Sequence, residues 1–147
     1  MTLRKHLNDT MKQAMKARDV LRLSVVRMII SAVKNREIEQ KRELNDQEVI
    51  DIISTLGKQR RESIRFYREG NRADLVEKEE SELAILLDFL PAQLDSNEIA
   101  ELVTRLIREI GAEGPKDMGR TMKALTPLIA GRADGKVVSD LVRQQLS

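Results

Sequence analysis

Residues 90–111 read LPAQLDSNEIAELVTRLIREIG, and this stretch predicts how the chain is organised. Pro91 disfavours α geometry at Leu90, so a helix arriving from the N-terminal side is expected to end there. Asp95 and Glu98 then have the spacing of a helix-capping pair, and apolar residues follow at helical spacing until Gly111. The sequence therefore predicts a hinge between two helical parts at this point.

The rest of the chain predicts helices and no sheet. Phe66, Tyr67 and Phe89 are its only aromatic residues, and β-branched residues do not alternate with polar ones. Apolar residues recur instead at spacings of three and four. We expect an all-α protein, with a four-helix N-terminal part over residues 1–90 and a compact three-helix module over residues 91–147.

Start and stop signals mark the helices of the first part. The first helix is expected to break near Arg18-Asp19, and the second to carry a polar tail, residues 35–43, that projects or frays. Asn45 and Glu48 have the spacing of a capping box for the third helix.

Gly70-Asn71 is expected to stop the third helix and to cap the fourth. The fourth helix then runs from about Ala73 to Leu90, where Pro91 ends it. In the second part, Asp117 is the predicted cap of the next helix, which Pro127 disturbs.

Glycines in the last third predict particular backbone geometry. Gly119 inside a helix costs about 1 kcal/mol relative to alanine, so close approach of a neighbouring helix is expected there. Gly131 and Gly135 are expected in turns with positive φ, beside an Asp134 cap. We treat a group of residues as the structural motif of this segment: Pro91, Asp117, Gly119, Gly131, Asp134 and Gly135.

Composition restricts the chemistry. The chain has no cysteine and one histidine, His6, which excludes a cysteine-rich zinc site, a disulfide framework and a cysteine nucleophile. No metal or cofactor is expected. No long apolar run and no leader-like apolar segment are present, so we expect no membrane partner and a cytoplasmic location.

Charge is unevenly distributed although the net charge is only +2. Residues 1–72 hold 17 basic and 10 acidic side chains, and residues 73–90 hold one basic and six acidic. The first half can therefore attract a polyanion through counterion release.

A row of basic residues is the main nucleic-acid candidate. Lys58, Arg61, Arg65 and Arg68 recur at spacings of three, four and three, so they share one edge of the third helix. Arg60 and Arg72 lie nearby in sequence. The row has a second interpretation, an ordinary solvated face, since Glu62 and Glu69 are spaced to pair with it.

The segment from Gly114 to Thr121 imitates the spacing of a phosphate-binding loop. It lacks the required preceding strand, Pro115 removes a backbone donor, and Asp117 adds a negative charge, so we reject nucleotide binding there. Residues 131–136 form a charged corner with two interpretations. Arg132 and Lys136 either contact phosphate or an acidic partner, or they are solvated charges flanking an Asp cap.

No catalytic residue is predicted. The carboxylates of residues 77–82 lack a partner nucleophile or histidine, His6 stands alone, and no serine has a triad context.

Several ordered motifs resemble the YqeY group of the GatB/YqeY family over essentially the whole chain. Arg120 stands where the family often has lysine, which keeps the charge. The matching residues are Arg61-Glu62-Ser63, Gly70, Arg72, Asp74-Leu75, Glu79, Glu82-Leu83, Leu90-Pro91, Gln93-Leu94, Lys116-Asp117-Met118-Gly119, Met122 and Gly131-Arg132-Ala133-Asp134-Gly135-Lys136.

This resemblance implies an all-helical protein with four helices followed by three. It also implies kinship to the tail of the tRNA-dependent amidotransferase B subunit, a glutamine-dependent carbon–nitrogen ligase. In that enzyme the tail contacts tRNA and other domains carry the chemistry.

Three hypotheses follow for function. The first is a non-catalytic accessory module that binds tRNA or a tRNA–protein assembly. The second is a protein-interaction or scaffold module that docks partners through apolar grooves between the two helical parts, and the third is a part in amidotransfer with partner subunits. Under the first hypothesis the nucleic-acid-binding candidates are Lys58, Arg61, Arg65, Arg68, Arg72, Arg132 and Lys136.

Overall fold

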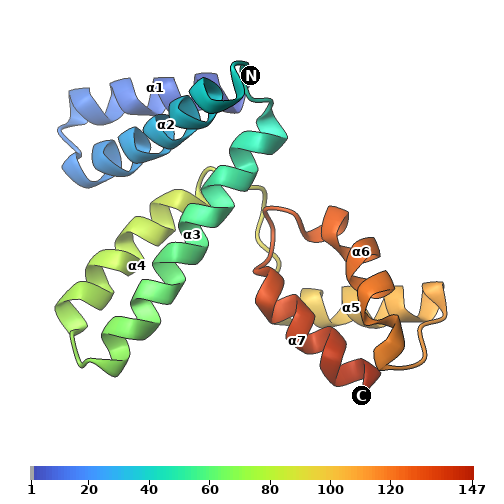
Figure 1. Ribbon diagram of the computed structural model, residues 1–147. Helices are drawn as coiled ribbons and strands as arrows, with labels where there is room; N and C mark the ends of the chain where they lie inside the picture. Colours follow the sequence, from blue (N-terminus) through green and yellow to red (C-terminus); the bar gives the residue numbers. More distant parts are fainter. Residues whose placement is uncertain (1) are drawn as a thin grey trace. The chain divides into compact units, whose positions relative to one another are not determined.

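The computed structural model describes residues 2–147, and all regular structure within them is helical (Figure 1). The all-α prediction is confirmed. The elements are α1 (Leu3–Ala17), α2 (Val20–Gln40), α3 (Asp46–Glu69), α4 (Ala73–Leu87), α5 (Ser96–Ile110), the 3-10 turn η1 (Pro115–Asp117), α6 (Met118–Ile129) and α7 (Gly135–Leu146).

The chain divides into two compact units, one ending at Pro91 and the other beginning at Ala92. We call them the N-terminal unit, which holds α1 to α4, and the C-terminal unit, which holds α5 to α7. Each has its own buried apolar core.

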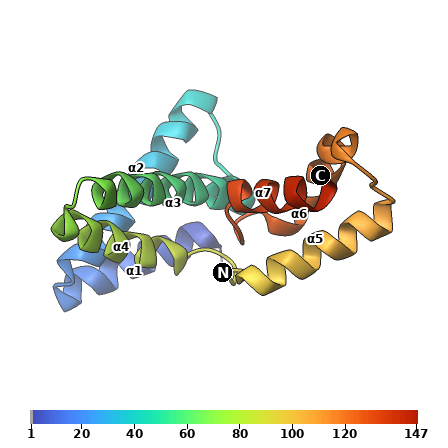
Figure 2. The same cartoon turned by 90° about the horizontal axis from the view of Figure 1, so that it is seen from below.

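Two helical hairpins build the N-terminal unit, α1 with α2 and α3 with α4 (Figures 1 and 2). Arg18 takes the left-handed conformation at φ 57° and ends α1, and the Asp19 side chain accepts the N–H of Arg22 to start α2. The predicted break at this turn is confirmed. The core joins both hairpins through fully buried side chains such as Ile29, Ile53 and Leu86.

Of the two alternatives predicted for the polar tail of α2, that it projects or frays, fraying is not observed over residues 35–40. The tail stays helical to Gln40. The Glu37 carboxylate holds it in place by accepting hydrogen bonds from two groups. One is the Arg4 guanidinium, and the other is the Leu44 backbone N–H, at 2.9 Å. A contact with α1, distant in sequence, therefore keeps this segment ordered.

The start of α3 matches the sequence and its end differs in detail. Asn45 and Glu48 form the predicted capping box. Asn71 has positive φ at 57°, but it does not cap α4, whose N-cap is Arg72 without a side-chain hydrogen bond. Gly70 itself has an ordinary φ of −86°.

Helix α4 ends at Leu87, three residues before the predicted Leu90. After Leu87 the backbone forms a tighter, 3-10-like turn. The N–H groups of Phe89 and Leu90 donate to carbonyls three residues earlier, each at 3.1 Å. Pro91 restricts the residue before it, and this tighter turn accommodates that restriction.

In the C-terminal unit, α5 begins and ends at the predicted residues. The Asp95 carboxylate accepts the Glu98 N–H at 2.8 Å, and Gly111 closes the helix at φ 69°. The core beneath it contains fully buried residues from all three helices, among them Val103, Leu125 and Val142.

The predicted capping of α6 by the Asp117 side chain is wrong. Asp117 precedes α6 but its side chain does not cap it; the carboxylate instead accepts the N–H of Glu113 at 2.8 Å, back in the preceding loop. That bond and Arg120 lower the pKa of Asp117. Pro127, which was predicted to disturb this helix, lies inside it, and α6 continues to Ile129.

The glycine predictions are correct only in part. Gly131 has the expected positive φ of 72°, whereas Gly135 is the first residue of α7 and is not among the residues with positive φ. A Cβ at Gly119 would meet nothing within 4 Å, so the expected close approach of a helix is absent there. Gly119 lies in the first turn of α6, which faces open space at this point.

Candidate nucleic-acid interface

The basic row lies along one edge of α3. This helix is unbroken over 24 residues, and spacings of three and four keep side chains on one side of a helix. The row borders the contact with α4: Lys58, Arg65 and Arg68 are exposed, whereas Arg61 is half-buried, with its Nη1 4.0 Å from where a Cβ at Gly57 would stand. At Gly57 a Cβ would lie 3.6 Å from Cδ1 of Leu83 on α4.

Among the described residues, one side chain of the row forms an ion pair with α4, and the other three do not. Arg68 lies 2.7 Å from Glu80 of α4. Among residues 2–147, Lys58, Arg61 and Arg65 form no ion pair, and neither Glu62 nor Glu69 pairs with the row. We call Lys58, Arg61 and Arg65 the basic edge.

Arg72, the last member of the predicted set, stands at the turn before α4. Its guanidinium lies 3.2 Å from the Asp74 carboxylate and lowers the pKa of Asp74. Arg72 is therefore exposed but already paired.

Arg60 does not belong to the row, contrary to its place in the sequence. It points toward α4, where its Nε lies 2.9 Å from Glu82 and 3.4 Å from Glu79. Its Nη2 also contacts the sulfur of Met28 at 2.8 Å. Only 19% of the Arg60 side chain is exposed, so two members of the acidic run on α4 serve an internal ion-pair cluster.

Phe66 is a surface feature that the sequence analysis did not single out. Its side chain is 70% exposed, and its ring meets Tyr67 edge-on with centroids 5.8 Å apart. Phe66 is about a third of a turn from the basic edge, with Glu62 between them on the helix. The available signal was its position outside the apolar stripe of α3.

The charged corner belongs to the C-terminal unit and is largely structural. Arg132 is half-buried, and its Nε donates to the Ala92 carbonyl at 3.1 Å while its own carbonyl accepts the Leu94 N–H at 2.9 Å. Asp134 accepts the Lys136 N–H at 3.0 Å and so caps α7. Lys136 is the exposed cation of this corner.

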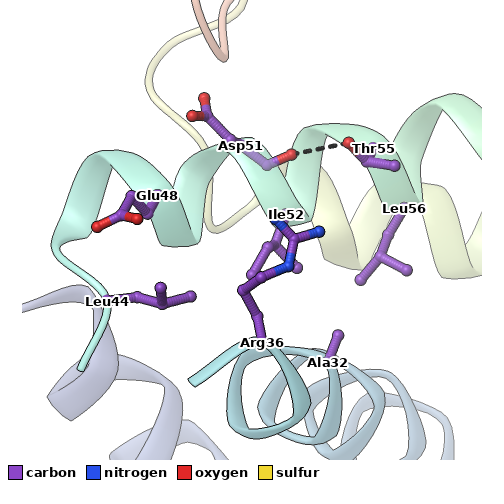
Figure 3. A pocket seen from close by; sticks show the side chains of 8 residues that line it. All are labelled: Ala32, Arg36, Leu44, Glu48, Asp51, Ile52, Thr55 and Leu56. Carbon is purple, nitrogen blue, oxygen red and sulfur yellow. Dashed lines mark hydrogen bonds between the residues drawn. The ribbon is translucent and has the colours of Figure 1, made fainter. Parts of the chain in front are cut away.

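A hollow of about 320 Å³ lies between α2 and α3 (Figure 3). Ala32, Ile52 and Leu56 form part of its apolar lining, and Arg36 extends from α2 toward α3 beside them. At this hollow the Thr55 hydroxyl donates to the Asp51 backbone carbonyl at 3.0 Å.

A metal-binding cluster is not found in the part of the chain that the structure describes. Residues 2–147 contain no group of three or more His, Cys, Asp or Glu residues able to hold a metal ion. His6 packs its ring against Phe89, with centroids 5.2 Å apart. None of the helices described combines the length and apolar character needed to cross a bilayer.

The α1–α2 hairpin carries basic residues that the sequence analysis counted only in a sum. Its ion pairs use Arg4, Arg22 and Arg36. The basic residues of this hairpin with no ion pair among the described residues are Lys5, Lys12, Lys16, Arg18, Arg27 and Lys34. Regular spacing of the lysines along α1 was the signal that could have found them.

Fold and site together define a class: an all-helical protein of two units with a positively charged helix edge. The family model described as "Yqey-like protein" matches residues 4–146, so the chain belongs to the YqeY-like family. The resemblance seen in the sequence motifs is thereby confirmed at the level of the family.

Curated relatives are fungal proteins named "Altered inheritance of mitochondria protein 41, mitochondrial". The one from Lachancea thermotolerans is 38% identical over 75% of this chain and 60% of its own length. Those from Kluyveromyces lactis and Vanderwaltozyma polyspora are 38% and 42% identical, each over 58% of this chain and 47% and 48% of their own lengths. The chain thus spans about half the length of the curated relatives it matches.

These names contradict the cytoplasmic location expected from the sequence. That expectation rested on missing cysteines and a missing leader-like segment. An absence of cysteine is compatible with more than one compartment, so composition was a poor guide to location.

Proposed function

We propose that this protein is a non-catalytic accessory module that binds tRNA or a tRNA–protein assembly through the basic edge of α3. The observation that carries the proposal is the lack of any acidic partner for Lys58, Arg61 and Arg65 within the described residues. Cations free of protein partners release counterions when they contact phosphates, and this release drives binding to nucleic acid.

The neighbouring ion pairs support the assignment of the edge. Glu79 and Glu82 are directed to Arg60, and Glu80 is directed to Arg68, so the acids of α4 do not neutralise it. The kinship to the amidotransferase tail motivates tRNA as the probe. The mitochondrial names of the relatives make mitochondrial tRNA a second probe.

Filter binding of tRNA across a range of salt concentrations tests the proposal. The variant Lys58→Ala/Arg61→Ala/Arg65→Ala is expected to bind more weakly at low salt. Its slope of log affinity against log salt should fall by about 2–3, because each phosphate contact contributes about 0.9.

A matched control removes cations that are already paired. Arg68→Ala/Arg72→Ala lowers the charge of the same region, yet these side chains already contact Glu80 and Asp74. It should change the salt slope less than the edge variant does. Failure of the wild type to retain tRNA at low salt, or an unchanged slope in the edge variant, would refute the proposal.

The C-terminal corner is a separate part of the proposal. Lys136→Ala tests it, since this side chain is exposed while Arg132 contributes a hydrogen bond to Ala92. A reduction of the salt slope by about 1 would place one phosphate contact there. An unchanged slope would leave Lys136 as a solvated residue beside the Asp134 cap.

The scaffold alternative, predicted to use grooves between the two helical parts, is supported instead by a hollow within the N-terminal unit, between α2 and α3. Thr55 is exposed at its rim, and Thr55→Arg would obstruct the hollow without altering its apolar lining. Pull-downs at low salt with and without ribonuclease separate the two functions. A partner that survives ribonuclease and is lost with Thr55→Arg supports a scaffold.

A further inference from the structure

The turn between α1 and α2, at the left of Figure 1, combines apolar exposure with positive charge. Val20 is 76% exposed, Met15 51% and Leu21 37%, which brings three large apolar side chains to one turn. We call Met15, Val20 and Leu21 the apolar tip. Exposed apolar groups gathered in this way mark an interaction site more often than isolated ones do.

Cations surround the apolar tip and are free of ion pairs. Lys12, Lys16 and Arg18 have no acidic partner among the described residues. Asp19, the acid of the turn, is occupied, because it accepts the Arg22 N–H and pairs with the Arg22 guanidinium at 3.6 Å. The tip therefore presents a net positive field.

The positive field continues along the outer side of the hairpin. Lys5, Lys12 and Lys16 are spaced by seven and four residues, which keeps them on one side of α1, opposite the buried Leu7 and Ala14.

On α2, Arg27 and Lys34 are likewise seven residues apart and lie on the side opposite the buried Ile29. Asp9 is the one acid of the hairpin without an ion pair in the described structure.

We propose that the α1–α2 hairpin docks on an anionic membrane surface, with the apolar tip inserted at the headgroup level. Charge complementarity selects an anionic surface, and exposed aliphatic side chains beside the cations select a lipid surface over a nucleic acid. An RNA partner would use the cations and leave Met15 and Val20 without a role.

This assignment is consistent with the absence of a membrane-spanning helix in residues 2–147, because a surface-bound protein needs none. It departs from the sequence-based expectation of no membrane partner, which considered only spanning segments. It is also independent of the proposed RNA binding, which uses α3.

Vesicle co-sedimentation of the full chain tests the proposal. The wild type is expected to bind vesicles of phosphatidylcholine with about one third phosphatidylglycerol at low salt, and not pure phosphatidylcholine vesicles. Lys12→Gln/Lys16→Gln/Arg18→Asn should weaken partitioning on the order of 100-fold, since each cation near the surface contributes about fivefold. Asn is chosen at position 18 because it tolerates the left-handed conformation found there.

A second variant separates the apolar term from the charge term. Met15→Gln/Val20→Gln keeps every charge and alters two exposed positions, so the fold should persist by circular dichroism. Its vesicle binding should fall about tenfold or more at unchanged charge. A simple electrostatic attraction would leave this variant like the wild type, and that result would overturn the insertion.

The matched control is the basic edge of α3, where Lys58→Gln/Arg61→Gln/Arg65→Gln removes as many free cations elsewhere. This control should keep vesicle binding. Absence of wild-type binding to anionic vesicles, or an equal loss in the control and in the tip variants, would refute the proposal. Loss of tRNA retention in the tip cation variant, with vesicle binding unchanged, would assign the tip to RNA and equally refute it.

Discussion

At the scale of single residues, Glu48 carries out more than one task at the start of α3. Its side chain accepts the Asn45 N–H at 3.2 Å in the capping box and pairs with Arg42 at 2.6 Å. The hydrogen bond from Arg42, followed by that from Asn45, lowers the pKa of Glu48 to about 2. The charged form of this carboxylate is therefore favoured in the folded protein.

We predict a pH-dependent stability contribution from Glu48. Because its folded pKa lies below its ordinary value of 4.5, the contribution is complete above pH 4.5 and is lost as the pH falls toward 2. Glu48→Gln retains an acceptor for the capping box but removes the charge. Denaturant unfolding of wild type and variant should show a stability difference at pH 7 that shrinks between pH 5 and about pH 2.

Glu101→Gln is the reference for that comparison, because Glu101 is exposed and has no ion pair among the described residues. It corrects for the general effect of removing one carboxylate. A Glu48→Gln difference that stays constant from pH 7 to pH 2, after this correction, would show that Glu48 is not held in its charged form.

Glycines show at the same scale what sequence reasoning reaches and what it does not. Gly111 and Gly131 have positive φ. This could be predicted, because a glycine just after a helix commonly takes the left-handed conformation. Gly57 gives no such signal, because it lies inside an uninterrupted helical pattern. Its packing beside Leu83 of α4 depends on a contact 26 residues away in sequence, which helical spacing does not encode.

At the scale of elements, helix starts could be predicted because a cap is a local interaction. Asn45, Asp95 and Asp134 each accept a backbone N–H two or three residues ahead, and the sequence displays both partners. The same reasoning gave a wrong cap at Asp117, because its carboxylate accepts the N–H of Glu113, four residues earlier in the sequence. That the tail of α2 does not fray could not be predicted for a similar reason, since Glu37 pairs with Arg4 of another helix.

Arg60 is the element-scale case with the largest energetic consequence. It lies between α3 and α4 with Glu79 and Glu82, and each of these acids is only 15% exposed. Neither Arg60 Nε nor one Glu79 carboxylate oxygen has a well-aligned hydrogen bond, so charge pairing is the main compensation there. Removing one partner of such a cluster leaves the others buried and uncompensated.

We predict that Arg60→Met destabilises the protein by about 2 kcal/mol or more, because two half-buried carboxylates lose their counterion. The triple variant Arg60→Met/Glu79→Gln/Glu82→Leu should recover much of this loss, since the stranded charges are removed with it. Urea unfolding followed by circular dichroism measures both. Lys78→Met, an exposed cation of α4, serves as the reference, and an Arg60→Met variant as stable as this reference would contradict the prediction.

At the scale of the whole molecule, the sequence could predict that the basic residues share one edge of a helix. It could not predict which of them lack an ion pair. Spacing along α3 places Lys58, Arg61 and Arg65 together, and the sequence shows this directly. Which cations remain unpaired depends on where the carboxylates of α4 point, and this follows from tertiary packing. For that reason Arg60 and Arg68 form ion pairs with carboxylates of α4.

The C-terminal unit offers a prediction about independent folding. All of its core residues come from α5, α6 and α7 or the residues joined to them, such as Leu94. The segment before α5 forms hydrogen bonds within the same unit. The Leu94 N–H donates to the Arg132 carbonyl, and Arg132 Nε donates to the Ala92 carbonyl. A fragment of residues 92–147 therefore retains these hydrogen bonds and the buried core of the unit.

We expect the fragment 92–147 to fold alone, with a cooperative thermal transition and modest stability, because a domain of this size buries a small share of its surface. A fragment of residues 96–147 lacks the Asp95 cap, Leu94 packing and both bonds to Arg132, and should be less stable by about 2 kcal/mol. Circular dichroism melts of the two fragments, at matched concentrations to expose any self-association, make the comparison. If 92–147 shows no cooperative melt, the core of this unit is insufficient alone. If the two fragments melt together, the residues before α5 contribute nothing to its stability.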